Sequence, residues 1–287
     1  MVSLPPSKNT FPGSKDNLRF MPNSFVQASL PYSRQPTNEY RRTAGKYTLI
    51  LYSPDGLPYG SIPRLILSWL TTESIRTKKR QLFLGNSLSS FLEELGLHRT
   101  GGPRGDITRL RQQIDLLFGC FISLRYEDSY VKNGQHMAEK SIRNMLIAES
   151  ANLIWTPKKV GGKLFQPCDH GAPTITLSEA FYNELLSSPI PVDMNALKFL
   201  RNSPMALDMY FWLSYRLKYL RKPTVITWEQ LSVQFGANYS CIRDFKKNFL
   251  FHLPSVRQFV TDFDLFSDSS SLTLFPRQSD EEDHPSK

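Results

Sequence analysis

Apolar residues return every three or four positions along three stretches of the first half of the chain, residues 62–70, 88–95 and 107–118. This spacing places the apolar side chains on one face of a helix, so three amphipathic helices are expected here. Between the second and the third, residues 98–105 hold three glycines and one proline, which predicts a turn. Asp106 follows this turn and is a suitable N-cap for the third helix.

Short strands are expected around these helices. Residues 47–52 form an apolar run that a Ser-Pro-Asp-Gly turn ends, and residues 81–84 form another run after a basic turn. Apolar and polar residues alternate over residues 121–127, and a returning strand is expected within residues 142–155. The order helix, strand, helix, helix, hairpin is that of a winged helix-turn-helix.

The second half of the chain repeats this order of elements without repeating the sequence. A Ser-Pro pair opens a long helix there, and a Thr-Trp-Glu-Gln capping box opens a short one. The predicted helix, strand, helix, helix and hairpin occupy residues 204–217, 225–227, 228–235, 239–253 and 259–275. We therefore predict an α+β chain with two tandem winged-helix domains.

Composition sets the predicted domain boundaries. The first 45 residues are rich in Pro, Ser, Asn and Gln and have no sustained period, which predicts a disordered tail with a short docking segment around residues 20–26. Pro, Lys-Lys and Gly-Gly after residue 156 predict a linker between the domains. The predicted parts are a disordered tail, a first winged-helix domain, a linker, a second winged-helix domain and an acidic disordered tail, at residues 1–45, 46–156, 157–172, 173–276 and 277–287.

The chain carries a formal net charge of +9, in spite of an acidic run at residues 280–283, and its pI is about 9.4. This balance favours a polyanionic partner, most often a nucleic acid. No run approaches the roughly 18 apolar residues that a membrane helix needs, and no secretory signal is visible at the N-terminus. Three widely separated cysteines favour a reducing compartment. We expect a protein of a reducing compartment, associated with a nucleic acid and without a membrane partner.

Two of the predicted helices, residues 106–118 and 239–253, carry basic and polar residues opposite their apolar stripe. A helix of this kind fits the major groove of DNA, where Arg, Lys, Thr and Gln side chains meet base edges and phosphates. The alternative is that both are ordinary amphipathic helices whose polar faces contact only water. The side chains expected to contact double-stranded DNA are Arg104, Thr108, Arg109, Arg111 and Gln112 from the first half, and Ser240, Arg243, Lys246 and Lys247 from the second.

The sequence gives little evidence for a metal site, a nucleotide-binding loop or a catalytic site. Cys168 and His170 form the one close Cys/His pair, whereas a structural zinc site needs four such ligands. The glycine-rich run 101–105 lacks the Gly-Lys-Ser/Thr ending of a phosphate-binding loop, and all five histidines are isolated. The aromatic run 210–219 is expected to fill the core, although such side chains can also stack on unpaired bases. We expect no catalytic activity, no metal site and no cofactor.

Four blocks of the sequence resemble the plasmid-encoded RepA replication initiators. They read Leu-Pro-Tyr-Gly-Ser-Ile-Pro-Arg-Leu at residues 57–65, Trp-Leu-Thr-Thr-Glu-Ser-Ile-Arg-Thr at 69–77, Leu-Gly-Asn-Ser-Leu-Ser-Ser-Phe at 84–91 and Ser-Pro-Met-Ala-Leu-Asp-Met-Tyr-Phe-Trp-Leu at 203–213. The likeness runs over residues 47–266. The turn Pro-Arg-Gly before residue 106 departs from the family, which is expected to have an aromatic residue after the arginine, so the DNA contacts above rest on the helical faces.

The resemblance implies an initiator of plasmid replication with two winged-helix domains, located in the bacterial cytoplasm and associated with the nucleoid or the plasmid. Such proteins bind repeated origin sites (iterons), help to open the adjacent AT-rich DNA, and recruit the host initiator DnaA and the replicative helicase. Many repress their own gene as dimers, while the monomer is active in replication. Two alternatives stay open: a winged-helix transcriptional regulator without an initiator role, and a protein-interaction module. An enzyme is a more distant alternative.

Overall fold

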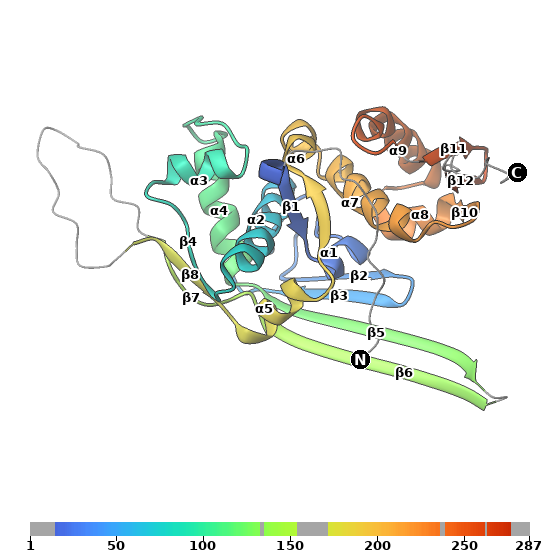
Figure 1. The fold of residues 1–287 in the computed structure, drawn as a ribbon, viewed down its shortest axis with the longest axis horizontal. Coiled ribbons are helices and arrows are strands. Elements are labelled where there is room, and N and C mark those ends of the chain that lie inside the picture. The colour runs from blue at the N-terminus through green and yellow to red at the C-terminus, as the bar shows by residue number, and fades with distance from the viewer. Residues whose placement is uncertain (1–14, 133–134, 154–171, 236–238, 262, 277–287) are drawn as a thin grey trace, which may run out of the picture.

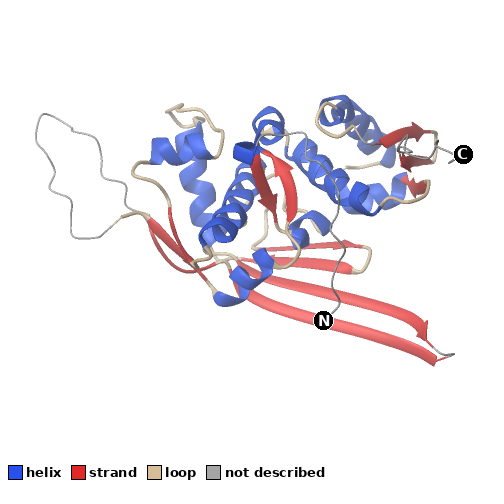
Figure 2. Cartoon of the chain, in the orientation of Figure 1, coloured by secondary structure: helices blue, strands red, loops and turns tan. Residues whose placement is uncertain are grey.

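The computed structural model describes residues 15–132, 135–153, 172–235, 239–261 and 263–276. These residues form a mixed structure of helices and sheets in which every strand pair is antiparallel. The helices lie along one side of the molecule, and a long two-stranded hairpin projects below them (Figures 1 and 2). The predicted α+β class is therefore confirmed.

The first unit is built around the long helix α2 (Ser61–Thr77), most of which is buried. After it follow β4 (Gln81–Phe83), α3 (Leu88–Glu94) and α4 (Asp106–Phe118). A hairpin that belongs to another sheet comes next in the chain, and β7 (Ala148–Asn152) and β8 (Thr174–Leu177) then complete the unit. Ser87 and Ser90 form a capping box that begins α3. The three strands form a sheet in the order β4-β8-β7, so the last strand lies in the middle.

The second unit has the same order of elements and the same sheet order. It consists of α7 (Pro204–Tyr219), β10 (Thr224–Thr227), α8 (Trp228–Phe235), α9 (Ile242–Arg257), β11 (Phe263–Ser267) and β12 (Ser271–Pro276). Its sheet runs β10-β12-β11, again with the last strand in the middle. The repeat that the sequence predicts is thus present in the topology.

The aromatic run of α7 belongs to the core, as expected. Tyr210, Phe211 and Trp212 are buried, and burial raises the pKa of Tyr210 to about 12. The Tyr210 hydroxyl accepts a hydrogen bond of 2.7 Å from the backbone N–H of Asp193. Tyr219, at the end of the helix, is 59% exposed.

The hairpin predicted for the first domain belongs to a separate sheet and not to the sheet of β4, β7 and β8. The strands β5 (Phe121–Lys132) and β6 (Gln135–Leu146) join β2 (Glu39–Ala44) and β3 (Tyr47–Tyr52) in a four-stranded sheet of order β2-β3-β5-β6. Tyr126 pairs with Tyr47, the first residue of β3, and beyond this point β5 and β6 pair only with each other. The hairpin therefore extends past the sheet as an arm (Figure 1).

The predicted linker at residues 157–172 does not separate the two units. Residues 157–171 lie outside the described residues, but β7 before them and β8 after them pair in one sheet, and β8 also pairs with β4. The start of the second domain at residue 173 was therefore wrong, because β8 completes the first sheet. The helix α5 (Glu179–Leu186) follows, and then β9 (Ile190–Asp193) and α6 (Met194–Leu200) lead to α7.

The predicted disorder of residues 1–45 is wrong for the part that the structure describes. The 3₁₀ turn η1 (Lys15–Asn17), the strand β1 (Leu18–Met21) and the helix α1 (Asn23–Gln27) precede β2, and β1 pairs with β9. Met21, Phe25 and Leu30 are buried, which confirms the docking segment expected around residues 20–26. The sequence did not predict this ordered structure, because the segment is mostly polar. Its few apolar residues are too irregularly spaced to show the period of a helix or a strand. Residues 1–14, and the acidic tail at 277–287, lie outside the described residues.

The N-terminal segment joins both units. Gln234 of α8 donates a hydrogen bond of 2.9 Å to the carbonyl of Gln27. Arg42 of β2 donates one of 3.2 Å to the carbonyl of Val233, also on α8, and its Nε donates to the Tyr40 hydroxyl at 2.9 Å. Gln27 and Arg42 of the N-terminal segment thus contact the second unit.

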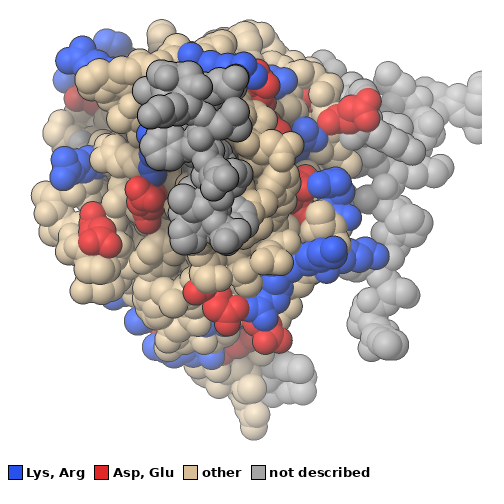
Figure 3. Space-filling model, turned by 90° about the vertical axis from the view of Figure 1, so that its left-hand side faces the viewer, with Lys and Arg blue, Asp and Glu red and all other residues tan. Residues whose placement is uncertain are grey.

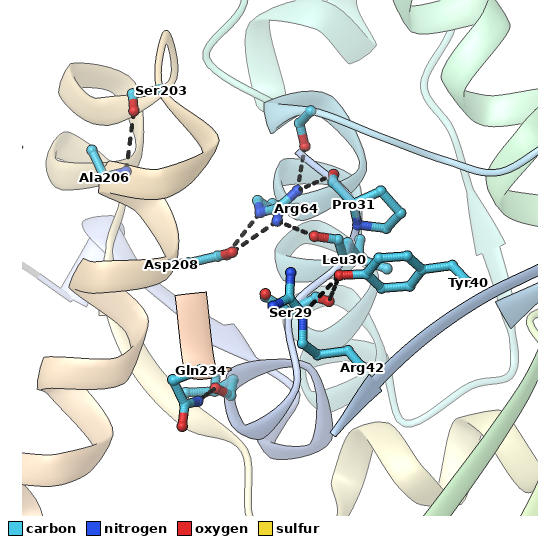
Figure 4. A network of polar contacts seen from close by, with 12 residues as sticks. Ser29, Leu30, Pro31, Tyr40, Arg42, Arg64, Ser203, Ala206, Asp208 and Gln234 are labelled. Atoms are coloured by element: carbon cyan, nitrogen blue, oxygen red, sulfur yellow. Dashed lines mark hydrogen bonds and ion pairs between the residues drawn. The ribbon is translucent and has the colours of Figure 1, made fainter. Parts of the chain in front are cut away.

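A buried ion pair connects the two long helices, with Arg64 on α2 and Asp208 on α7 (Figure 4). The side chains are 1% and 5% exposed. Arg64 Nε and Nη2 each donate to the carboxylate at 2.7 Å. The remaining N–H groups face the carbonyls of Leu30, Pro31 and Gly60, at 2.7, 3.3 and 2.6 Å. All five donors of the guanidinium therefore have acceptors.

Removing Asp208 should destabilise the whole molecule, because Arg64 would remain buried without its counter-charge. We expect Asp208→Ala to lower the free energy of unfolding by about 3–5 kcal/mol. Arg64→Met with Asp208→Leu should recover only part of the loss, because the carbonyls of Leu30, Pro31 and Gly60 then lose their donor. Urea denaturation followed by circular dichroism measures both effects.

Glu127→Ala is the control, since it breaks the Glu127–Lys140 pair, which has both side chains 60% exposed. That variant should unfold at the wild-type midpoint. A wild-type midpoint for Asp208→Ala would contradict the role given to the buried pair.

Candidate nucleic-acid interface

The helix α4 presents the face that the sequence predicts. Leu110, Ile114 and Leu117 are buried against the first unit. The predicted DNA-contacting side chains all lie on the exposed side, namely Arg104, Thr108, Arg109, Arg111 and Gln112. Gln113 is buried, and its Oε1 accepts a hydrogen bond of 2.8 Å from the backbone N–H of Tyr59. This bond ties α4 to the start of α2.

The turn before α4 is held tightly against the N-terminus of the helix. The N-cap is Gly105 and not Asp106, one residue earlier than predicted. The Asp106 carboxylate instead accepts a hydrogen bond of 3.1 Å from the His98 backbone N–H. A Cβ on Gly105 would lie 2.4 Å from the carbonyl oxygens of Thr100 and Gly101, so only glycine fits there.

Thr108 has an intramolecular partner as well as an exposed position. Its hydroxyl donates a hydrogen bond of 2.8 Å to the carbonyl of Gly102. The backbone N–H of Asp106 donates to the Thr100 hydroxyl at 2.9 Å. These bonds fix the shape of the turn that carries Arg104, so Thr108 positions the turn in addition to facing solvent.

The helix α9 offers a second exposed basic face. Phe245, Phe249 and Leu253 are buried, whereas the side chain of Arg243 is 88% exposed and Lys247 and Ser240 are also exposed. Ile242, the first residue of α9, is 40% exposed because it lies at the margin of the core.

Lys246 differs from the other predicted contacts because the protein itself binds its amino group. Lys246 Nζ lies 5.0 Å from the ring centroid of Trp228 and donates a hydrogen bond to the carbonyl of Asp268, in the turn between β11 and β12. The side chain therefore anchors this turn to α9. Its contact with DNA remains a prediction.

Arg109 and Arg243 are accessible to solvent in spite of nearby carboxylates. Arg109 Nη1 lies 3.3 Å from Asp106 Oδ1, and Arg243 Nε lies 3.8 Å from Asp244 Oδ1. Both arginine side chains are more than half exposed, and exposed pairs of this kind are weak. A phosphate or a guanine edge can therefore compete for either guanidinium.

Charge alone does not mark out an interface. At the end of the molecule that carries α3, α4 and the β7–β8 strands, basic side chains form several separate groups with acidic residues among them (Figure 3). The two helices are distinguished by their topology and by their exposed polar side chains.

Sequence reasoning missed Phe251, which is 74% exposed on α9. It follows Arg243 and Lys247 at intervals of four residues, so its place on the polar stripe was visible in the spacing.

Within the described part of the chain, no group of three His, Cys, Asp or Glu residues is placed to hold a metal ion. No helix in the same part is long and apolar enough to cross a bilayer.

The chain is similar to known proteins in family and in fold. The model of the family of plasmid encoded RepA proteins matches residues 57–230, more than half of the chain. A crystal structure of selenomethionine derivatives of domains 2 and 3 of RctB aligns with a TM-score of 0.55 and 12% identity, covering 90% of this chain and 99% of that chain. Another structure of RctB domains 2–3 has a TM-score of 0.52, 13% identity, and coverages of 89% and 97%. At these identities the likeness shows the fold alone. No curated protein matches the sequence.

The two described cysteines should differ sharply in reactivity. Cys120 is buried, and burial raises the pKa of its thiol to about 12, whereas Cys241 is exposed at the N-cap of α9. With such a pKa only about one Cys120 thiol in ten thousand is ionised at pH 8. In a Cys168→Ser background, iodoacetamide should alkylate Cys241 in the native protein and Cys120 only after denaturation. Peptide mass spectrometry distinguishes the two sites, and early labelling of Cys120 would contradict its burial.

Proposed function

This chain belongs to the family of plasmid encoded RepA proteins, and from that premise we propose that it initiates plasmid replication by binding double-stranded DNA at repeated sites (iterons) of the plasmid origin. The bound protein would help to open the adjacent DNA and recruit the host initiator DnaA and the replicative helicase. It would also repress its own gene as a dimer. It acts by binding, without catalysing a reaction, in the bacterial cytoplasm where the plasmid resides.

One observation carries the proposal: two units with the same topology each present a helix with an exposed basic face. Apart from the hairpin β5–β6, which is inserted after α4 and belongs to another sheet, each unit has the order helix, strand, helix, helix, strand, strand, and the last strand lies in the middle of the sheet. We infer that both are winged-helix domains, with α4 and α9 as their recognition helices and with β7–β8 and β11–β12 as their wings. In such domains the second helix of the motif enters the major groove.

The exposed residues on these helices suit different parts of DNA. Arg109 and Gln112 lie three residues apart on α4, and an arginine can bind guanine while a glutamine binds adenine. Arg243 and Lys247 take the corresponding place on α9, one turn apart. Two helices in one rigid chain can contact two neighbouring segments of the same duplex.

A second candidate function is that of a winged-helix regulator which does not initiate replication, because the same two helices would serve it equally well. A minimal replicon separates the two functions. Deleting the gene should abolish replication if the protein is an initiator, and supplying the protein in trans should restore it. A replicon that persists without the gene would leave only the regulator.

Replacing Arg109 or Arg243 should weaken binding to origin DNA. The pattern of the loss should show whether the arginine contacts a base or a phosphate. A lost bidentate base contact costs about 1–3 kcal/mol and relaxes the preference at one position, whereas a lost phosphate contact weakens all sequences alike. We expect Arg109→Ala and Arg243→Ala each to reduce affinity by one of these two patterns. Fluorescence anisotropy at two salt concentrations, on cognate and mutated sites, measures the difference.

Arg41→Ala is a matched control, since Arg41 of β2 is 52% exposed and Arg109 is 53% exposed. This variant should bind as the wild type does. Unchanged affinity in both Arg109→Ala and Arg243→Ala would refute the assignment of the recognition helices.

DNA should also protect the thiol at the start of α9. Cys241 lies between Ser240 and Arg243 along the chain and is exposed in the free protein. If α9 enters the major groove, origin DNA should slow the alkylation of Cys241 at least severalfold, and random-sequence DNA should do so less. Undiminished labelling at saturating origin DNA would place α9 outside the complex.

A further inference from the structure

A carboxylate-free cleft lies where the two units meet, beside α4. Its volume is about 290 Å³. Its walls come from the segment after α1, the start of α2, the outer side of α4 and the turn before α7. The residues that matter to its chemistry are Ser33, Arg34, Ser61, Arg109, Gln112 and Asn202.

The walls of this cleft favour an anion. Two arginines line it, Arg34 and Arg109, and neither aspartate nor glutamate is among its lining residues. The first residues of α2 and of α7, both long helices, are also at its edge, and helix N-termini carry a partial positive charge. Arg34 has no ion pair with any carboxylate in the described part of the chain.

The cleft also lies between the two proposed recognition helices. Arg109 and Gln112 of α4 form one wall. Asn202 also lines the cleft, and the neighbouring Ser203 contacts α9 directly, with 3.2 Å between its hydroxyl and Nε2 of His252. The cleft thus has lining residues on α4 and next to a residue that contacts α9.

We propose that the cleft holds a phosphate of the DNA backbone between the two segments of duplex that α4 and α9 contact. Arg34 supplies the charge and Asn202 a neutral donor, and neither residue belongs to a recognition helix. This inference rests on the proposed function, because it presumes that both helices engage one duplex. The contact is independent of base sequence, and its role is to set the path of the backbone across the junction.

The salt dependence of binding tests the assignment. Each phosphate contact contributes about 0.9 to the slope of log affinity against log salt concentration, so Arg34→Ala should lose roughly eightfold in affinity at 0.1 M salt and almost nothing near 1 M. The loss should be the same on cognate and mutated sites. Asn202→Ala should weaken binding less and keep the wild-type slope, and Arg41→Ala should change neither quantity.

Methylphosphonate scanning locates the phosphate itself. One neutral methylphosphonate is placed at each position of the origin fragment in turn, and we expect one position between the two footprints to weaken the wild type but not Arg34→Ala. An unchanged slope for Arg34→Ala, or equal sensitivity of both proteins at every position, would overturn the proposal while origin binding by the wild type upholds the proposed function. A wild type that does not bind the origin would overturn both.

A free phosphate is the other possible occupant. Inorganic phosphate is added to wild type and to Arg34→Ala, and the melting temperature is compared with that in chloride at equal ionic strength. Stabilisation of the wild type alone, together with an unchanged DNA slope for Arg34→Ala, would assign the cleft to a free phosphate and remove it from the DNA path.

Discussion

The buried ion pair between Arg64 and Asp208 fixes how the two halves of this protein face each other. A charge inside a protein is tolerated only when its counter-charge and its hydrogen-bond acceptors are in place. Arg64 meets that condition with a bidentate carboxylate from α7 and three carbonyls from the N-terminal segment and the start of α2. Rotating or sliding one unit against the other would leave at least one of these groups unpaired. The pair is therefore better understood as a determinant of geometry than as a source of net stability.

This requirement explains why a segment of unremarkable composition is ordered. The carbonyls of Leu30 and Pro31 are acceptors for Arg64, and Tyr32 lies under the guanidinium, with its ring centroid 5.1 Å from the Arg64 Cζ. Burial raises the pKa of the Tyr32 hydroxyl well above its usual range, so it stays neutral beside the ion pair. The chain that follows then forms one wall of the cleft at α4. Ordering of the segment, alignment of the units and formation of the cleft thus have one cause.

The sequence predicted local structure well and tertiary partners poorly. The faces of α4 and α9 could be predicted because a 3.6-residue period fixes which side chains share a side, whatever the helix packs against. The alternation over β5 predicted a strand, but a period of two carries no information about the neighbouring strand, so the pairing with β3 was missed. The same limit applies to β8, whose residue Ile175 pairs with Leu82 across more than half of the first unit.

The two residues of the ion pair lie in two of the sequence blocks that resemble the family, and only the structure shows that these blocks are in contact. Arg64 lies in the block at residues 57–65 and Asp208 in the block at 203–213, far apart in the chain and both within the span that the family model matches. Two blocks that the sequence presents as separate signatures are the two halves of one contact. A duplex has fixed groove spacing, with successive major-groove sites on one side about 34–36 Å apart. A protein that contacts two such sites gains affinity from the second only if its helices are held at a matching separation, since any freedom between them is lost on binding. Under the proposed function, the ion pair would restrict the relative motion of α4 and α9 before DNA binds, so less conformational freedom would be lost on binding.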